Sequence, residues 1–293
     1  MSVTHVDANG NTANCTVAVC PIDLSVYGYR PSLGASGALI GLYVVCLLIQ
    51  AALGLRYRTW WFMFAMVLGC IDEILGYVGR ILYWQNPWGS TGFILQIVLI
   101  TIGPVFFAAA IYTLLAQIVH YISVSHSRFD PKWYLRIFLP CDILSLVLQA
   151  IGGGLSSGSN GNNTAAVDIA LAGLAFQVFT LAVFVVLAAD YLIRSRAVWL
   201  NMRSPLRFQI FCITSSAATI AILIRCTYRI YELSQGYSQS SVVLRDQGLF
   251  IGLESVMVIF AAYCLIIAHP GPTFAEMARH KSTGSVDTGA AKA

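Results

Sequence analysis

Seven long apolar runs dominate the hydrophobic pattern of the chain and are separated by short polar segments. A helix needs roughly 20 apolar residues to cross the hydrocarbon core of a membrane. None of the runs alternates regularly between apolar and polar residues, as the strands of a membrane barrel would. The pattern therefore predicts an all-α integral membrane protein, a bundle of seven transmembrane helices. The runs cover residues 33–53, 60–83, 93–119, 135–155, 168–191, 208–231 and 246–268.

The composition agrees with this class. Of 293 residues, 58% are hydrophobic and 10% are charged, whereas a soluble domain carries about 25% charged residues. The basic residues behind the net charge of +4 lie mostly in the polar segments between the runs, so the charge indicates membrane topology. It gives no sign of a nucleic-acid partner. We expect membrane lipids or an amphiphilic small molecule as partners, and the sequence sets no oligomeric state.

The basic residues also predict the orientation. With residue 1 outside, twelve of the seventeen Lys and Arg residues fall in cytoplasmic segments, and only Arg30 and Arg245 fall in outer ones. This bias follows the positive-inside rule, so we predict an outer N-terminus and a cytoplasmic C-terminus. Residues 1–32 then form an extracellular or lumenal tail, 33–268 the membrane domain, and 269–293 a cytoplasmic, disordered tail. The expected location is the plasma membrane, with an internal membrane as the alternative.

The predicted outer segments carry candidate modification sites. Asn14 and Asn162 each begin an N-x-[ST] sequon, and both are candidates for glycosylation. Cys15 and Cys20 lie in the outer tail, where oxidation is permitted, and we predict a disulfide between them. The aromatic ring of Tyr27, near the end of the tail, is expected to anchor in the lipid headgroups.

Charged residues inside the apolar runs are the most informative exceptions to the pattern. Arg225, Arg229 and Glu232 stand at i, i+4 and i+7, so one helical stripe carries all three. Charges in a membrane span are costly and usually face a bundle interior or an aqueous cavity. Counting from the run ends places most such residues in the outer half, so we predict a polar layer shared by six helices. The candidates in and around this layer are Glu73, Tyr77, Arg80, Gln96, Asp142, Gln149, Gln177, Arg225, Arg229, Glu232 and Glu254.

Two interpretations of the layer stay open. It is either an ion-pair network that fixes the packing, with Glu73 and Glu254 as the expected partners of Arg225, or a site for an amphiphile. In the second case the layer receives a polar head while apolar walls take an acyl chain or sterol. Pro104, in the middle of the third run, is a candidate hinge because a proline frees a helix carbonyl and usually kinks the helix.

Some chemistries lack the residues they need. The apolar runs have no histidine except His120 and His269 at their inner edges, so the ligands of an intramembrane zinc site are missing. The chain also has no phosphate-binding P-loop. We therefore expect no metal, no cofactor and no catalytic residue, and we do not expect an enzyme.

A series of short motifs resembles one known family. In order along nearly the whole chain, they are similar to the fungal seven-helix lipid-translocating exporter-like proteins, a family associated with resistance to aminocholesterol and export of sphingoid long-chain bases. One departure is Gln247, which stands where the family pattern has the first of two acids, while Glu254 matches the second. The matching motifs are Tyr27-Gly-Tyr-Arg-Pro-Ser32, Glu73-x-x-Gly-Tyr-x-Gly-Arg80, Pro104-x-x-x-Ala-Ala-x-Ile-Tyr112, Asp142-x-x-x-x-x-x-Gln149-x-x-Gly-Gly, the Gln177 region, Arg225-x-x-Tyr-Arg-x-x-Glu232-x-x-x-Gly236 and His269-Pro-Gly271.

The resemblance implies lipid or amphiphile export, or stress resistance, at a membrane. Our leading hypothesis is a translocase or exporter of sphingoid bases or sterol-like lipids, linked to resistance to toxic lipids. Glu73, Glu232 or Glu254 would hold a cationic sphingoid amine, and the arginines would keep these acids ionised. A seven-helix receptor or sensor of an amphiphile is the first alternative. An intramembrane lipid-modifying enzyme, with Glu and Tyr as acid and base, is the second.

Overall fold

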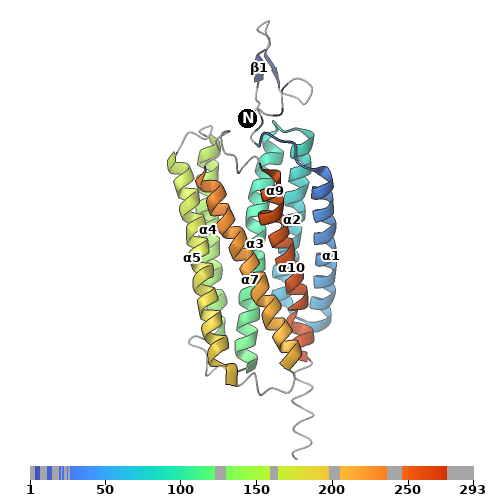
Figure 1. Cartoon of the computed structure of the whole chain (residues 1–293), viewed down its shortest axis with the longest axis vertical. Coiled ribbons are helices and arrows are strands. Elements are labelled where there is room, and N and C mark those ends of the chain that lie inside the picture. Colours follow the sequence, from blue (N-terminus) through green and yellow to red (C-terminus); the bar gives the residue numbers. More distant parts are fainter. Residues whose placement is uncertain are drawn as a thin grey trace, which may run out of the picture.

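The computed structural model describes residues 4–6, 12–14, 20, 22, 25, 27–122, 130–158, 164–197, 205–235 and 246–275. Within these residues, seven helices are long and apolar enough to cross a membrane. They stand side by side as one bundle (Figure 1). The predicted class, a multi-pass helical membrane protein, is therefore confirmed. The orientation of the two termini stays a prediction, and we keep the term outer end for the end at which α1 begins.

Each predicted run coincides with one of these helices. The helices extend beyond most of the runs because polar residues complete their first and last turns. The last span is composite, since its first half is wound as a π-helix, and residues 270–275 continue it as a further helical turn. The bounds are Leu33–Tyr57 for α1, Trp60–Gln85 for α2, Ser90–Ile122 for α3, Pro131–Gly158 for α4, Thr164–Arg194 for α5, Pro205–Ser234 for α7, Gln247–Leu249 for α9, Phe250–Val256 for η3 and Met257–Ile267 for α10.

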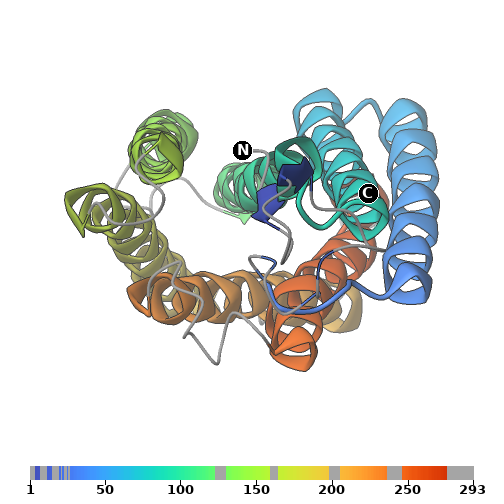
Figure 2. The same cartoon turned by 90° about the horizontal axis from the view of Figure 1, so that it is seen from above.

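The helices form a closed ring in which sequence neighbours pack against each other (Figure 2). Helix α10 closes the ring by contacting both α7 and α1. Helix α3 also contacts α7 and α10, so it reaches across the bundle in addition to packing on α2 and α4. It is correspondingly the most buried span: in its most apolar stretch of 18 residues, 56% lies inside the protein. Side chains on α3 are thus able to meet polar groups from several helices.

Glycines bring α2 and α3 into close contact. A Cβ atom on Gly79 of α2 would lie 2.8 Å from the backbone nitrogen of Gln96, and one on Gly92 of α3 would lie 2.6 Å from that of Tyr83. Backbone atoms cannot move aside as the tip of a flexible side chain can. Small residues are what allow membrane helices to approach this closely.

At the opposite end of the bundle, the His269-Pro-Gly271 motif packs on the turn between α1 and α2. The ring of buried His269 meets Phe62 edge to face, with 5.3 Å between centroids, and its Nε2 lies 3.5 Å from the Thr59 hydroxyl. A Cβ on Gly271 would collide with the Tyr57 side chain. Residues 269–275 therefore belong to the packed bundle, and the predicted tail boundary at residue 269 lies too early.

A strap formed by residues 27–30 lies across the outer ends of α2 and α3. Tyr27 is only 4% exposed and packs its ring on Tyr83 and Phe93 at centroid distances of 5.4 and 5.5 Å. The Nε of Arg30 donates to the carbonyl of Trp84 at 2.8 Å, and its guanidinium stacks on that indole. The expected lipid anchor is thus wrong for Tyr27, because protein covers its ring.

The N-terminal tail also contains a short β-hairpin that the sequence did not predict. Strand β1 (Thr4–Val6) pairs antiparallel with β2 (Thr12–Asn14), and Thr4 lies opposite Asn14. The hairpin lies beyond the outer end of the helices (Figure 1).

The predicted modification sites are described only in part. Cys20 is disulfide-bonded, but its predicted partner Cys15 lies outside the described residues, so the pairing stays a prediction. The backbone of Asn14 lies in β2, whereas Asn162 and residues 276–293 fall outside the described part of the chain. Both glycosylation sites also stay predictions.

Candidate functional site

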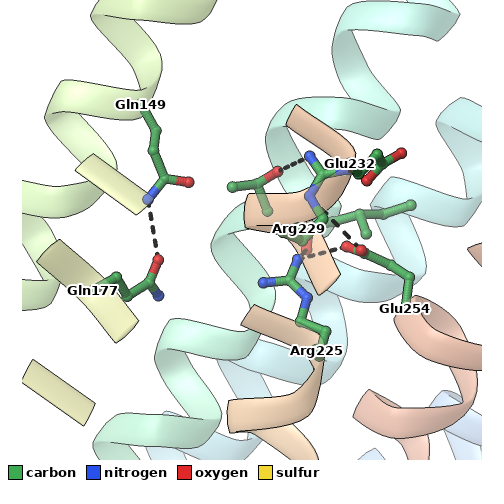
Figure 3. A network of polar contacts seen from close by, with 8 residues as sticks. Gln149, Gln177, Arg225, Arg229, Glu232 and Glu254 are labelled. Atoms are coloured by element: carbon green, nitrogen blue, oxygen red, sulfur yellow. Dashed lines mark hydrogen bonds and ion pairs between the residues drawn. The ribbon is translucent and has the colours of Figure 1, made fainter. Parts of the chain in front are cut away.

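The centre of the buried polar region is an ion pair between α7 and η3. Arg225 donates from Nη2 to Oε1 of Glu254 at 2.7 Å, and the two side chains are 1% and 0% exposed (Figure 3). Glu254 is thus confirmed as a partner of Arg225. Replacing one partner of such a pair leaves an uncompensated buried charge, so loss of either side chain is expected to destabilise the fold.

The second acceptor of Arg225 is a backbone carbonyl that a proline leaves free. The same Nη2 donates to the carbonyl oxygen of Ile100 in α3 at 2.7 Å. In a regular α-helix that carbonyl would accept from the nitrogen four residues later, but residue 104 is a proline and has no N–H. Pro104 therefore frees the oxygen to which Arg225 binds, and α3 continues through it as one helix. The role of Pro104 as a hinge stays a prediction.

Arg229 and Glu232 extend the ion pair toward the outer end. Nη1 of Arg229 donates to Oε2 of Glu232 at 2.6 Å, and Nη2 donates to the Thr101 hydroxyl at 3.3 Å. Nε of Arg229 lies 3.7 Å from Oε2 of Glu254, which joins the two pairs. We call Arg225, Arg229, Glu232 and Glu254 the arginine–glutamate cluster. Two positive and two negative side chains balance one another within it.

The last span contributes Glu254 to the cluster from its π-helical segment η3. Glu254 and Ser255 are consecutive, and both are buried, at 0% and 1% exposure. The i→i+5 hydrogen bonds of a π-helix widen the turn, and such segments occur often at functional sites. Gln247, which begins α9 seven residues before Glu254, is only half-buried.

Arg80 lies under the outer strap. It donates from Nη2 to the Tyr29 hydroxyl at 3.1 Å, and its guanidinium stacks on the Phe250 ring at 3.9 Å from the centroid. Burial raises the pKa of Tyr29 above its usual range despite the neighbouring Arg80, so its hydroxyl remains neutral and able to accept this bond. No described carboxylate forms an ion pair with Arg80, and its Nη1 has no hydrogen-bond partner among the described residues.

Among the predicted acids, Glu73 alone accepts no hydrogen bond from the part of the chain that the structure describes. It is 1% exposed, and neither carboxylate oxygen accepts a hydrogen bond from any described residue. Its carboxylate lies against Gly103 of α3, where a Cβ atom would come within 2.5 Å of Oε1. Tyr43 on α1 and Tyr77 on α2 lie near this carboxylate, and Ser255 on η3 lies near Tyr77. The hydroxyls of all three are buried, and none has a hydrogen-bond partner of good geometry among the described residues. We call these four residues the Glu73 compartment.

On the other side of α3, the buried polar groups are satisfied. The Tyr112 hydroxyl donates to Oδ2 of Asp142 at 2.8 Å, and Thr180 donates to Oδ1 at 3.5 Å. Gln149 on α4 donates to Gln177 on α5 at 3.0 Å, and Figure 3 shows this pair apart from the arginine–glutamate cluster. These contacts join α3, α4 and α5, and they leave no charge without a partner.

The structure thus divides the predicted layer. All eleven candidates lie on inward-facing positions or at helix contacts, but they form the arginine–glutamate cluster, the strap contact of Arg80, the Glu73 compartment and the α4–α5 contacts. Gln96 is buried with both amide atoms unpartnered in the described structure. The sequence prediction left five contact residues out of the layer. For Tyr43, Thr101, Thr180 and Ser255 the only sequence signal was a hydroxyl inside an apolar run, whereas Tyr112 also ends one of the family motifs.

Within the described parts of the chain, no three His, Cys, Asp or Glu side chains are arranged to hold a metal ion. The site offers charge pairs and hydrogen-bonding groups in an apolar surrounding, which suits recognition of a polar head on an apolar molecule.

Comparison with known proteins identifies the family. The profile of RTA1-like proteins matches residues 66–277, which include five of the seven spans in full, most of α2, and every residue of the arginine–glutamate cluster. The chain belongs to the RTA1-like protein family. This confirms the resemblance found in the motifs, and the matched range begins before Glu73.

Several yeast proteins are similar to the chain. One from Saccharomyces cerevisiae (strain Lalvin EC1118 / Prise de mousse), named sphingoid long-chain base transporter RSB1, is 32% identical over 81% of this chain and 69% of its own length. Protein RTM1 of Saccharomyces cerevisiae is 26% identical over 83% of this chain and 88% of its own. Protoporphyrin uptake protein 1 of the same species (strain ATCC 204508 / S288c) is 29% identical over 68% of this chain. No solved structure matches.

Proposed function

We propose that this protein is a membrane transporter of long-chain amphiphiles of the sphingoid-base class. The observation that carries the proposal is the 32% identity to a protein named sphingoid long-chain base transporter, over 81% of this chain. The relatives also include a protein named for protoporphyrin uptake, another large and partly apolar molecule. Amphiphiles with a small polar head and a large apolar body are the common chemistry of these names.

The interior of the bundle supports this proposal. Buried polar atoms without partners among the described residues extend from Gln96, six residues into α3 from the outer end, to Gln50, seven residues before the opposite end of α1. At a rise of 1.5 Å per residue, both lie about 10 Å inside their helix ends. A buried polar atom without a partner costs free energy. A head group or water moving between these positions would offset that cost.

We further propose that the protein exports its substrate across the plasma membrane and so protects the cell from toxic lipids. No covalent step is needed for this activity, so the proposal assigns no catalytic residue. The arginine–glutamate cluster then has a structural part, because its charges are already balanced, and the substrate head is left to the unpartnered groups.

Transport is tested with the purified full-length chain in liposomes. Labelled sphinganine, a C18 sphingoid base, is added on one side, and its arrival on the other side is followed with a trapped acceptor. We expect faster transfer than in liposomes that lack the protein. The direction is tested in cells by efflux of the same label with and without the protein. Equal rates in both assays would contradict the proposal, and a ligand-dependent cytoplasmic partner found by crosslinking would favour the receptor alternative.

A further inference from the structure

We infer that the Glu73 compartment binds the protonated amine of the substrate, with the Glu73 carboxylate as the anion that faces it. The inference rests on the proposed function and assigns its head-group site. It separates Glu73 from Glu232 and Glu254, which were equal candidates in the sequence.

Hydrogen bonding singles out Glu73 among the buried acids of the bundle. Glu254 accepts from Arg225 and Glu232 from Arg229, each within 2.7 Å, and Asp142 accepts from Tyr112 at 2.8 Å. Glu73 is equally buried but accepts from no described residue. An isolated buried carboxylate is far more costly than a paired one, so it is retained only where a cation or proton joins it.

The neighbours of Glu73 fit the rest of a sphingoid head. Such a head carries an ammonium group flanked by two hydroxyl groups. An ammonium donates three hydrogen bonds and accepts none, and a carboxylate is its strongest acceptor. The hydroxyls of Tyr43, Tyr77 and Ser255 both donate and accept, so they suit the two alcohols. The rings of Tyr43 and Tyr77 stack with centroids 6.0 Å apart, which brings the α1 and α2 sides of the compartment together.

The charges that surround Glu73 favour a cation beside its carboxylate. Arg225 is a positive side chain that acts on Glu73, but it forms an ion pair with Glu254 at 2.7 Å. Arg80 is seven residues from Glu73 on α2, about 10 Å along the helix axis, and it lies under the strap. Asp72 and Glu254 add negative potential beside Glu73. A neutral or anionic lipid head would leave the Glu73 charge without a partner.

Gly103 keeps the space beside the carboxylate open. A methyl group at this position would lie 2.5 Å from Oε1 and 3.0 Å from the carboxyl carbon of Glu73. Gly153 on α4 meets no atom within 4 Å at the same added position. The two glycines therefore form a matched pair, because the same substitution disturbs the compartment in one case and touches nothing in the other.

The test compares two ligands with the same chain, sphinganine and N-acetylsphinganine, whose nitrogen is a neutral amide. The purified full-length protein is held in lipid nanodiscs, and its Tm is read from the reaction of buried thiols such as Cys70 and Cys226 with a dye. We expect sphinganine to raise the Tm of the unaltered protein more than its amide does. Glu73→Gln should lower the affinity for sphinganine at least about tenfold, because a charge-assisted bond is lost. It should also abolish the preference over the amide.

The variant has a second readout that a structural role would not give. Because Glu73 has no partner to lose, Glu73→Gln should leave the ligand-free Tm unchanged or raise it. Asp142→Asn, which neutralises a hydrogen-bonded acid, should keep the preference for sphinganine. Glu73→Asp should keep the preference at reduced affinity, because it retains the charge.

Three results would overturn the site. The first is unchanged sphinganine preference in Glu73→Gln, and the second is an equal loss in Asp142→Asn. If Glu73→Gln does not fold, the test compares Gly103→Ala with Gly153→Ala. Equal preference for sphinganine over its amide in these two variants is the third result. Transport by the unaltered protein is read separately in liposomes, so a failed head-group site is distinguished from a failed transport function.

Discussion

Arg225 and Glu254 form an ion pair of 2.7 Å in which neither side chain is more than 1% exposed. Removal of one partner leaves the other buried and unpaired. We predict that Arg225→Ala lowers the free energy of unfolding by about 3–5 kcal/mol. The double change Arg225→Met with Glu254→Leu should cost less than Arg225→Met or Glu254→Leu alone. Thermal unfolding of the unaltered protein, these two single variants and the double variant, followed by dye reaction of the buried thiols, measures the coupling. Additive losses would mean that the two residues do not depend on each other.

Pro104 is predicted to stabilise the bundle through Arg225. In Pro104→Ala, the new N–H at residue 104 competes for the Ile100 carbonyl, which now accepts from Arg225 at 2.7 Å. We expect a lower Tm than in the unaltered protein, although alanine is the better helix former. The effect should disappear in the Arg225→Met, Glu254→Leu background, where no guanidinium needs the carbonyl. A higher Tm for Pro104→Ala alone would show that the proline only weakens α3.

The Tyr29 hydroxyl is predicted to stabilise the packing of the strap on α2. Tyr29→Phe removes the acceptor of Arg80, a charged hydrogen bond worth about 1.5–3 kcal/mol, while keeping the ring. Hydrogen exchange at residues 27–30 should accelerate, and exchange within α4 and α5 should not. Tyr231→Phe is the matched control, since Tyr231 is 54% exposed on α7. The same acceleration in the control would indicate a general effect of losing a phenol.

The contacts between α3, α4 and α5 are predicted to affect stability without affecting substrate preference. Tyr112→Phe leaves Asp142 without its 2.8 Å donor and should cost about 1–3 kcal/mol. The double change Gln149→Leu with Gln177→Leu removes both partners of one bond and should cost less. In correctly folded Tyr112→Phe, the ratio of the transport rates of sphinganine and N-acetylsphinganine should equal the ratio in the unaltered protein. A changed ratio would place Asp142 in the substrate site.

The spans could be predicted because length and hydropathy alone decide them in a membrane. Burial of the charged residues could also be predicted, since lipid cannot solvate Arg225 or Glu254. Their pairing followed from the same cost. What the sequence could not supply is which helix faces which, and that relationship separates Glu73 from the arginines.

Two features escaped the pattern for local reasons. Counting on a helix assumes 3.6 residues per turn, and the π-helix Phe250–Val256 breaks that count just before Glu254. The seven-residue spacing from Gln247 to Glu254 therefore does not put them on one face. Tyr27 had the composition of a lipid anchor, but the positions of Tyr83 and Phe93 at the outer helix ends give its ring a protein surface instead.

The Ile100 carbonyl, which accepts from Arg225 on a distant part of the chain, has a consequence for biogenesis. It lies 125 residues before Arg225 in the chain, so α3 is synthesised long before the guanidinium that satisfies it. Until α7 emerges, a proline-freed acceptor remains without its final donor in the membrane. A nascent chain stopped between α5 and α7 would carry this exposed acceptor as a mark of incompleteness. The arrival of α7 supplies the donor for this carbonyl of α3, and the last span then supplies Glu254, the other acceptor of Arg225.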